Sequence, residues 1–356
     1  MNTNNRRRKN GRCINCLLRI VFETKELAME LHPIWNDYPQ LQAELTQTLS
    51  LMEDAIQLKN KAVRKAILEM IGAGGKLLRP AYQLLFSRFG GKQDHQKTIA
   101  LAAAIEMLHT ATLIHDDIVD DASLRRNLPT ISAEFDNNTA VYAGDYLFVA
   151  CFKLMSSYTG TLRSLQKNAS SMENILTGEL GQMEDHYNLA ITVEEYLANI
   201  SGKTAELFAL SCSVGAFESG TSQLFAKNVS DIGHQIGMAF QIIDDILDYT
   251  QGGEELGKPV LKDVQQGVYT LPLIYALQAD RQQLVPLLEK KEHMSENDKQ
   301  KVYQLVNESG GVAKAQQLAN TYTQNALTKI EKLPNDPQNT KITLYQLTET
   351  LLTRTN

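Results

Sequence analysis

Apolar residues recur at helical spacing along most of this chain, from about Leu41 to its C-terminal end. The stretches 98–120, 192–216 and 224–250 keep this pattern, and no stretch shows sustained strand-like alternation. Turn signals, such as the Gly-Gly pairs that start at Gly74 and Gly252, are widely spaced, as expected between long helices. No Gly/Ser-rich or Pro-rich linker divides the chain. The pattern predicts one all-α domain over residues 29–356, a bundle of roughly ten or more helices.

The composition narrows the class of protein. With 43% hydrophobic and 21% charged residues among 356, the chain has the material for a large globular core. Its net charge of −6 does not favour nucleic acid, whose protein partners usually carry a basic surface. Four cysteines give no disulfide framework in so long a chain, and Cys13 with Cys16 is half a zinc site at best. No uninterrupted apolar run comes near the ~20 residues of a membrane span, so we expect a cytoplasmic protein without a transmembrane segment.

Residues 1–28 differ from the rest of the chain. They begin with a polar and basic stretch, and a short apolar piece then leads to Met29. Three interpretations compete: a disordered basic tail, a weak contact with a membrane surface, or an extension upstream of a true start at Met29. We favour the tail or the extension, and expect at most loose membrane association.

Two acidic motifs with the pattern D-D-x-x-D interrupt the apolar helices. The first holds Asp116, Asp117 and Asp120, and the second holds Asp244, Asp245 and Asp248. Aspartates four residues apart stack on one helix face, where like charges repel each other. Burying them unpaired would cost several kcal/mol, so a positive partner is required. One cluster alone could be a solvated helix end, but isoleucine and leucine flank both clusters, with valine also at the first, which argues against that interpretation.

Carboxylates in this arrangement favour a hard cation. Two such motifs that face each other across a cavity would bind Mg²⁺, which prefers a few carboxylates together with the phosphate oxygens of a ligand. The chain also offers cations for such a ligand: Lys76, Arg79, Arg125, Arg126, Lys203, Lys258 and Lys262. Lys76 and Arg79 belong to the stretch GGKLLRP, where Gly74 and Gly75 permit close backbone approach. This stretch is a candidate diphosphate cradle and lacks the P-loop pattern.

At these residues the chain resembles the trans-isoprenyl diphosphate synthases, the polyprenyl synthetase family. From about residue 40 onward, eight motifs follow the family's order: GGKLLRP, LIHDDIVDDASLRRNLPT, YAGDYLF, GELGQ, GKTAELF, FQIIDDILDY, GKP and TLPLIYAL. The resemblance implies an isoprenoid synthase-type helical bundle around a central cavity. It also implies a Mg²⁺-dependent enzyme that condenses isopentenyl diphosphate head-to-tail with an allylic diphosphate.

Carried over residue by residue, the resemblance assigns roles to the polar positions. It implies that magnesium on the allylic diphosphate is held by Asp116, Asp117, Asp120, Asp244, Asp245 and Asp248. It implies that the same diphosphate meets Arg125, Lys203 and Lys258, with Thr204 and Gln241 nearby. It places Gly75, Lys76, Arg79, His109 and Arg126 at isopentenyl diphosphate. From the residues alone, His109 could equally be a buried core histidine, and the family pattern favours substrate binding.

The implied reaction needs no dedicated protein base. Magnesium neutralises the leaving diphosphate, the carbon–oxygen bond ionises to an allylic cation, the isopentenyl double bond attacks it, and a proton leaves to the departing diphosphate. The sequence departs from the family pattern at three positions. Leu77 stands where arginine is usual and leaves one cation fewer at the isopentenyl site, and Asn127 and Leu261 stand at or near positions that glycine usually holds.

Three positions upstream of Asp116 bear on product length. Leu108, Ala111 and Thr112 are not aromatic, and small residues there are similar to those of the long-chain enzymes of the family. We therefore predict a product of heptaprenyl length for quinone side chains, as in menaquinone. A shorter product of the geranylgeranyl or farnesyl class is the alternative, if Tyr146 or Phe148 from a neighbouring helix closes the tunnel.

Two functions from other classes fit less well. A non-catalytic partner subunit would be expected to lose the aspartates, and both motifs are intact. A terpene cyclase would not need the GGKLLRP cradle, and its second metal motif usually differs. The assembly stays open between a homodimer and a heterodimer with a small regulatory subunit, which resemblance to the bacterial heptaprenyl synthases suggests.

Overall fold

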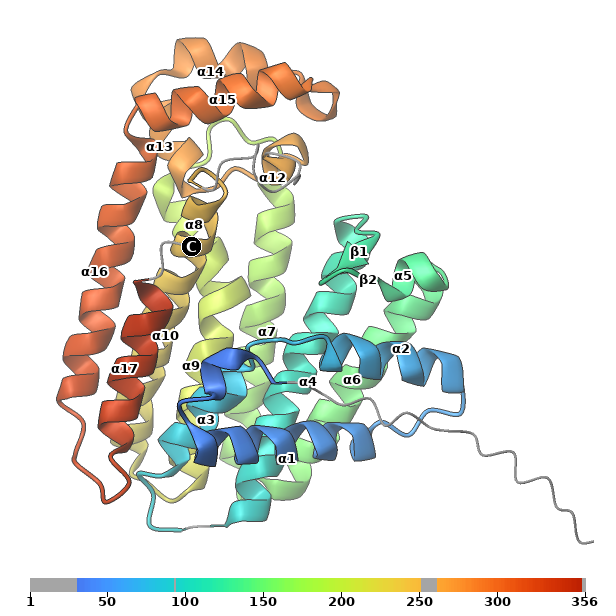
Figure 1. The fold of residues 1–356 in the computed structure, drawn as a ribbon, viewed down its shortest axis with the longest axis vertical. Coiled ribbons are helices and arrows are strands. Elements are labelled where there is room, and N and C mark those ends of the chain that lie inside the picture. The colour runs from blue at the N-terminus through green and yellow to red at the C-terminus, as the bar shows by residue number, and fades with distance from the viewer. Residues whose placement is uncertain (1–30, 93, 251–260, 354–356) are drawn as a thin grey trace, which may run out of the picture.

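The computed structural model describes residues 31–92, 94–250 and 261–353, and the structural statements below refer to these residues. It confirms the all-α prediction, because the described strands form one short antiparallel hairpin, β1 (Leu124–Arg125) and β2 (Leu128–Pro129) (Figure 1). The α-helices are α1 (Pro39–Ala55), α2 (Lys61–Gly72), α3 (Leu78–Ser87), α4 (His95–Val119), α5 (Ile131–Glu134), α6 (Asn137–Tyr158), α7 (Leu162–Glu184), α8 (Val193–Ile200), α9 (Glu206–Glu218), α10 (Gln223–Leu247), α12 (Lys262–Gln265), α13 (Leu271–Ala279), α14 (Arg281–Leu288), α15 (Glu296–Glu308), α16 (Gly311–Glu331) and α17 (Thr340–Leu352). Two 3₁₀ turns, η1 (Pro33–Trp35) and η3 (Lys291–His293), and one π-helical turn, η2 (Ser201–Ala205), complete the list.

Several sequence-based predictions fall outside these residues. They are the N-terminal extension 1–28 with Cys13 and Cys16, and Lys258 as a ligand of the allylic diphosphate. The two cysteines that the structure describes, Cys151 and Cys212, are buried free thiols.

Helices α4 and α9 form the centre of the bundle. Every residue of α4 from 99 to 108 is buried, and so is every residue of α9 from 207 to 216. Burial on all faces requires neighbours on all sides. Helix α4 packs against α1, α3, α6 and α9, whereas α10 packs between α9 and α16. The long helices α7, α10 and α16 run along the long axis of the molecule (Figure 1).

The apolar character of α4 exceeds the sequence-based expectation. By length and mean hydropathy it could cross a membrane, the one such helix in the part of the chain that the structure describes. Our expectation counted only uninterrupted apolar runs, whereas the mean hydropathy of a helix tolerates single polar residues. Within the tested window, 78% of the residues are buried inside the protein, as in the core helix of a bundle.

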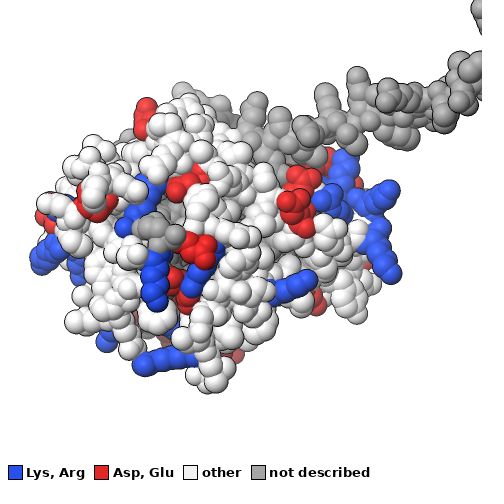
Figure 2. All heavy atoms as spheres, turned by 90° about the horizontal axis from the view of Figure 1, so that it is seen from below, with Lys and Arg blue, Asp and Glu red and all other residues white. Residues whose placement is uncertain are grey.

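Helices α4 and α10 share one design. Each is 25 residues long, begins at a side-chain cap, and ends at an aspartate: Asp94 caps the start of α4 and Ser222 that of α10, while Asp120 and Asp248 stand at the C-terminal ends. Helices α7 and α10 begin at the lower end of the bundle in Figure 1, away from the acidic motifs. Seen from below, the surface carries basic and acidic side chains among uncharged ones (Figure 2). The fold thus places both acidic motifs at the carboxyl ends of long helices.

Candidate active site

The two acidic motifs lie where helix dipoles oppose them. The carboxyl end of a helix carries a partial negative charge, which disfavours anions and favours cations. In the first motif, Asp116 and Asp117 lie in the last turn of α4, and in the second, Asp244 and Asp245 lie in the last turn of α10. The dipole therefore adds to the mutual repulsion of the carboxylates, and the demand for a positive partner is stronger than the sequence alone indicates.

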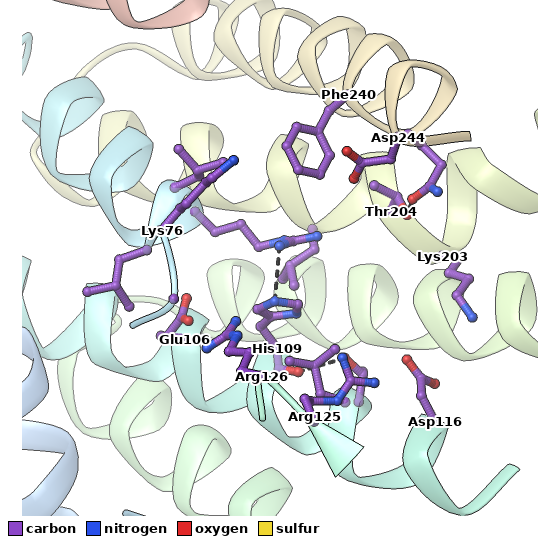
Figure 3. Close-up of a pocket in the computed structure, with 18 of the residues that line it drawn as sticks. Lys76, Glu106, His109, Asp116, Arg125, Arg126, Lys203, Thr204, Phe240 and Asp244 are labelled. Atoms are coloured by element: carbon purple, nitrogen blue, oxygen red, sulfur yellow. Dashed lines mark hydrogen bonds between the residues drawn. The ribbon is translucent and has the colours of Figure 1, made fainter. Parts of the chain in front are cut away.

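A cavity of about 650 Å³ separates the motifs. Asp116 from α4 and Asp244 from α10 lie on opposite sides of it, with Lys203 between them in the view of Figure 3. A second cavity of about 270 Å³ shares Asp116, Lys203 and several other lining residues with the first, and adds the carboxylates of Asp120, Asp245 and Asp263. The structure thus brings residues of both motifs to one pair of adjoining cavities, as predicted.

Burial makes these carboxylates hard to ionise. It raises the pKa of Asp116, and the nearby Asp120 raises it further. Burial also raises the pKa of Asp245 to about 8, although Tyr196 and Gln241 donate hydrogen bonds to its oxygens at 2.5 and 2.9 Å. The pKa of Asp263 is raised by burial and by Asp120. A cation bound among these groups would remove the penalty.

The donor set fits Mg²⁺ held jointly with a ligand. Within the described ranges, no three His, Cys, Asp or Glu side chains come close enough together to hold a metal ion alone. Magnesium is usually bound by one or two carboxylates plus substrate phosphates rather than by an all-protein cage. Hard oxygen donors on two facing helices, with room between them, match that mode.

Two of the predicted metal ligands lie away from the two cavities. The Asp117 carboxylate is almost fully buried and accepts a hydrogen bond from Nε of Arg125 at 2.7 Å. This ion pair orients Arg125, which does line both cavities. Asp248 is exposed at the end of α10 and lines neither cavity.

Lys203 is presented by the π-helical turn η2, between α8 and α9. Short π-helical segments are frequent at functional sites because they redirect side chains. Its Nζ donates to Oε2 of Glu179 on α7 at 2.8 Å. Burial alone would lower the pKa of Lys203, but Asp116 and Glu179 raise it, so the side chain is charged. The pKa of Glu179 is raised to about 7 by burial and by Asp116.

Glycines hold the π-turn against α7. A methyl group on Gly178 would lie 2.5 Å from the backbone nitrogen of Lys203 and 2.7 Å from Cα of Gly202. Backbone atoms cannot move aside cheaply, so glycine is needed where these two elements cross. Next to Lys203, Thr204 donates to Oε1 of Gln241 at 2.7 Å, and Gln241 donates in turn to Asp245, which joins η2 to the second acidic motif.

The other wall of the larger cavity is basic. Nη1 of Arg79 lies 3.2 Å from Nε2 of His109, and the Arg79 guanidinium lies 4.6 Å from the ring centre of Phe208. Burial, followed by the positive charge of Arg79, holds the pKa of His109 well below its ordinary value, so the neutral ring accepts from Arg79. Nε of Arg79 is buried without a hydrogen-bond partner among the described residues. Burial lowers the pKa of Arg79 to about 10, even though the negative charge of the nearby Glu106 acts in the opposite direction.

The GGKLLRP stretch is shaped around Arg126. A methyl group on Gly75 would lie 2.6 Å from Nη1 of Arg126, so the guanidinium fills the space that the missing side chain leaves. Trp35 fixes the stretch from behind by donating from Nε1 to the backbone oxygen of Lys76 at 3.0 Å. Lys76, Arg79 and Arg126 all line the cavity, and Figure 3 shows Lys76 and Arg126 among its lining side chains.

The three departures from the family pattern share one backbone feature. Leu77, Asn127 and Leu261 have φ angles of 49°, 64° and 54°, in the left-handed region. That region favours glycine, which gives a physical reason for glycine at or near the second and third positions. Leu77 is 5% exposed and packs into the core at the start of α3. It also lines the larger cavity, but because its side chain is apolar it supplies no charge there.

Of the predicted length-determining residues, one reaches the cavity. Thr112 lines it, whereas Leu108 and Ala111 are fully buried in α4 and do not. The two aromatic residues of the alternative prediction are engaged elsewhere. Tyr146 accepts a hydrogen bond from the backbone nitrogen of Gln57 at 2.8 Å, and Phe148 stacks on His115 with ring centres 5.5 Å apart.

Sequence reasoning missed several acidic and aromatic residues of the site. Glu106 is buried in α4 near Arg79 and Arg126, Glu179 pairs with Lys203, and Tyr196 holds Asp245. Signals existed for two of them: Glu106 lies one turn before His109, and Glu179 belongs to the GELGQ stretch. Asp263, which lines the smaller cavity, follows Lys262 and carried no motif of its own.

Comparisons with known proteins agree on one family. The family model described as polyprenyl synthetase matches residues 60–306. Heptaprenyl diphosphate synthase component 2 of Geobacillus stearothermophilus is 41% identical over 244 residues, which is 68% of this chain and 76% of that protein. A solved geranylgeranyl pyrophosphate synthase of Lactobacillus brevis is 42% identical with a TM-score of 0.86, covering 90% of this chain and 99% of the other. A solved heptaprenyl diphosphate synthase of Staphylococcus aureus is 32% identical with a TM-score of 0.81, covering 89% and 99%.

Proposed function

The chain belongs to the polyprenyl synthetase family and is a prenyltransferase, and from this premise we propose that it condenses isopentenyl diphosphate head-to-tail with an allylic diphosphate in a Mg²⁺-dependent reaction. One observation carries the proposal. A single cavity is lined by carboxylates of two facing helices at one end and by the basic side chains of Lys76, Arg79 and Arg126 at the other. Such a cavity can hold two diphosphates in different ways, one through metal ions and one through direct contact with cations.

The acidic end receives the allylic diphosphate. Asp116 and Asp244 would hold Mg²⁺, which when bound supplies the positive charge that stabilises the leaving diphosphate. Lys203 and Arg125 contribute fixed cations beside the carboxylates, so the departing group meets protein charge on its other side. Glu179 and Asp117 orient these two cations through ion pairs of 2.8 and 2.7 Å. Charge placed in advance where the reaction develops charge is the main source of catalysis in such sites.

The basic end receives isopentenyl diphosphate. Arg79, Arg126 and Lys76 line it, and the unpartnered Nε of Arg79 is a donor in need of an acceptor. His109 is neutral and holds the Arg79 guanidinium in place, so it acts on the substrate mainly through that arginine. Because Leu77 adds no charge, the binding of isopentenyl diphosphate relies on the side chains of Lys76, Arg79 and Arg126.

Substituting Gly75 tests the isopentenyl assignment. In Gly75→Ala the new methyl group displaces the Arg126 guanidinium, a flexible side-chain end, so the protein still folds. We expect KM for isopentenyl diphosphate to rise by about tenfold, the loss of one charge-assisted contact, with little change in KM for the allylic substrate. Gly91→Ala is the matched control, because a methyl group there has no atom within 4 Å. An equal rise for both substrates would contradict the assignment.

We further propose a product of heptaprenyl length that serves as a quinone side chain. The names of the relatives from Geobacillus stearothermophilus and Staphylococcus aureus support it. The geranylgeranyl synthase of Lactobacillus brevis supports the shorter alternative. The full burial of Ala111 also agrees with it, because a cavity closed at this residue leaves less room for a growing chain. Incubation of the purified chain with farnesyl diphosphate, labelled isopentenyl diphosphate and Mg²⁺, followed by sizing of the dephosphorylated products, decides between them. A product that stops at geranylgeranyl length overturns the long-chain proposal.

Thr112 offers a direct handle on product length. Its side chain lines the cavity one turn before Asp116, and the floor nearby is apolar, with Ile175, Leu207 and Phe240. Thr112→Phe should shorten the main product by at least one isoprene unit, because the ring occupies the space of the growing chain. Thr112→Val keeps the volume and should leave the product ladder unchanged. An unchanged ladder in Thr112→Phe would mean that the chain grows past another wall.

For the assembly we propose pairing with a second chain, either a copy of this one or a small regulatory subunit. Large apolar side chains are exposed along α6 and α7, where a soluble monomer rarely leaves so many. They are Val141, Tyr142, Val149 and Phe152 on α6, and Leu176, Leu180 and Met183 on α7. The relatives named component 2 support a second subunit. Molar mass in solution, with and without such a subunit, tests the choice.

A further inference from the structure

A third cavity lies far from the acidic motifs, at the end of the bundle where α7 and α10 begin and α9 ends. Its volume is about 570 Å³. It is lined by Arg163, Ser164, Lys167, Asn168, Ser213, Val214, Phe217, Gln223, Leu224, Ala226 and Lys227. None of these residues lines either of the two catalytic cavities. We call this space the lower cavity; Figure 2 views the molecule from the same end.

The lower cavity is electrically positive. Arg163, Lys167 and Lys227 line it, and no aspartate or glutamate of the described part of the chain does. Two long helices also start at its wall, since Arg163 lies in the first turn of the 23-residue α7 and Leu224 in the first turn of the 25-residue α10. The amino end of a helix carries a partial positive charge and free N–H groups, which attract anions. Side-chain charge and helix dipoles therefore act in the same direction here.

Nearby carboxylates do not cancel this charge. Glu218 at the end of α9 accepts a hydrogen bond from Ser164 through one oxygen and pairs with Lys97 at 2.5 Å through the other, so it is already neutralised. Glu206 attracts Lys167, yet burial still lowers the pKa of that lysine. An ammonium group that is partly withdrawn from water gains from an anionic partner.

An unpartnered donor marks the inside of the cavity. Asn168 is 4% exposed and lines the lower cavity, and its Nδ2 has no hydrogen-bond partner among the described residues. Buried amide N–H groups are almost always paired, because leaving one unpaired costs about 1–3 kcal/mol. Beside the three cations, an acceptor oxygen on a negatively charged ligand would supply the missing partner.

The remaining lining is apolar. Val214, Phe217 and Ala226 lie inside, and Leu224 at the rim is 69% exposed. The ligand therefore has an apolar part as well as an anionic one. The helices involved are those that form the floor of the larger catalytic cavity: Ile175 of α7, one of its lining residues, lies two helical turns from Asn168, or about 10 Å at 1.5 Å per residue.

We propose that the lower cavity binds the phosphate group of an anionic lipid, with Arg163, Lys167, Lys227 and Asn168 around the phosphate and the lipid chain along Val214, Phe217 and Leu224. Two sources share this chemistry. One is a phospholipid head group at a membrane surface, and the other is a soluble prenyl phosphate. The proposal is independent of the catalytic assignment, because it uses none of the catalytic residues.

Binding in the presence of EDTA tests this proposal, because without Mg²⁺ the acidic end of the catalytic cavity does not retain phosphates, and binding at its basic end is recognised because it survives in the lower-cavity variants. One probe is vesicles of phosphatidylglycerol compared with phosphatidylcholine, and the other is dodecyl phosphate below its micelle concentration. The double variant Lys167→Gln/Lys227→Gln should bind roughly tenfold or more weakly. Asn168→Leu keeps every charge and removes only the amide, and it should also weaken binding. Weaker binding by this variant indicates a specific site, because attraction by charge alone would be unaffected.

The controls make each outcome decisive. Lys301→Gln removes an exposed lysine on α15, outside the lower cavity, and should bind like the unmodified protein. All variants should retain prenyltransferase activity, which shows that they are folded. Binding to anionic vesicles and to dodecyl phosphate identifies a phospholipid, and binding to dodecyl phosphate alone identifies a soluble prenyl phosphate. No binding to either probe, or binding that survives in either Lys167→Gln/Lys227→Gln or Asn168→Leu, overturns the proposal.

Discussion

Asp116→Asn should lower the rate of prenyl transfer by about a thousandfold, the contribution expected of a metal that stabilises a leaving group by several kcal/mol. Asp116 is the one aspartate of the first motif that lines both cavities of the candidate active site. The metal-free protein should not be destabilised, because burial and Asp120 already penalise the Asp116 carboxylate, and a neutral amide escapes both penalties. Loss of activity with unchanged or higher melting temperature is the expected result.

Asp121→Asn is the matched control. Asp121 belongs to the same acidic run, but it is exposed, has a φ of 46° and lines neither cavity. Asparagine tolerates that conformation, so activity should be unchanged.

The second readout for Asp116→Asn is the melting temperature with Mg²⁺ plus inorganic diphosphate. A ligand at a hundred times its Kd stabilises the fold by about 2.7 kcal/mol, and Asp116→Asn should lose most of that gain. Full stabilisation of the variant would show that the metal is held without Asp116.

The parts of this site that could be predicted from sequence are those carried by one short stretch of chain, within or directly beside a single helix. The spacing of Asp116 and Asp120, and the apolar residues around them, predicted a cation site, and the structure places both at the adjoining cavities of the candidate active site. The same holds for Lys76 and Arg79, which flank the start of α3. Local periodicity fixes which residues share a helix face, and such predictions need no knowledge of the partner helix.

The parts that could not be predicted depend on contacts between helices. Asp117 and Arg125 both carried predicted roles as ligands, and nothing in their spacing showed that they pair with each other. Glu179 pairs with Lys203 across two helices, and its pKa rises because the bundle buries it and because the negative charge of Asp116 lies nearby. The left-handed backbone at Leu261 likewise follows from tertiary packing, since leucine does not favour it. These features needed the fold.

Gly178→Ala should reduce activity by about tenfold or more, although Gly178 lines neither cavity of the candidate active site. The added methyl group would lie 2.5 Å from the backbone nitrogen of Lys203. Because the obstacle is backbone, the π-turn η2 must shift away from α7. Overpacking of this kind costs about 1–3 kcal/mol of stability. The shift also carries Lys203 away from Glu179, so we expect KM for the allylic diphosphate to rise while KM for isopentenyl diphosphate stays nearly constant.

Gly181→Ala, three residues further along α7, separates this mechanism from a general intolerance of the helix. A methyl group there would lie 2.8 Å from Oδ1 of Asn199, the end of a side chain that can turn aside, so the variant should behave almost like the unmodified protein. If Gly178→Ala lowered stability but kept both KM values, Lys203 would not depend on the crossing of η2 and α7. If it raised KM for the allylic substrate alone, the glycine contact would be what positions the cation, because the two substrates share one cavity and differ in the end at which each binds.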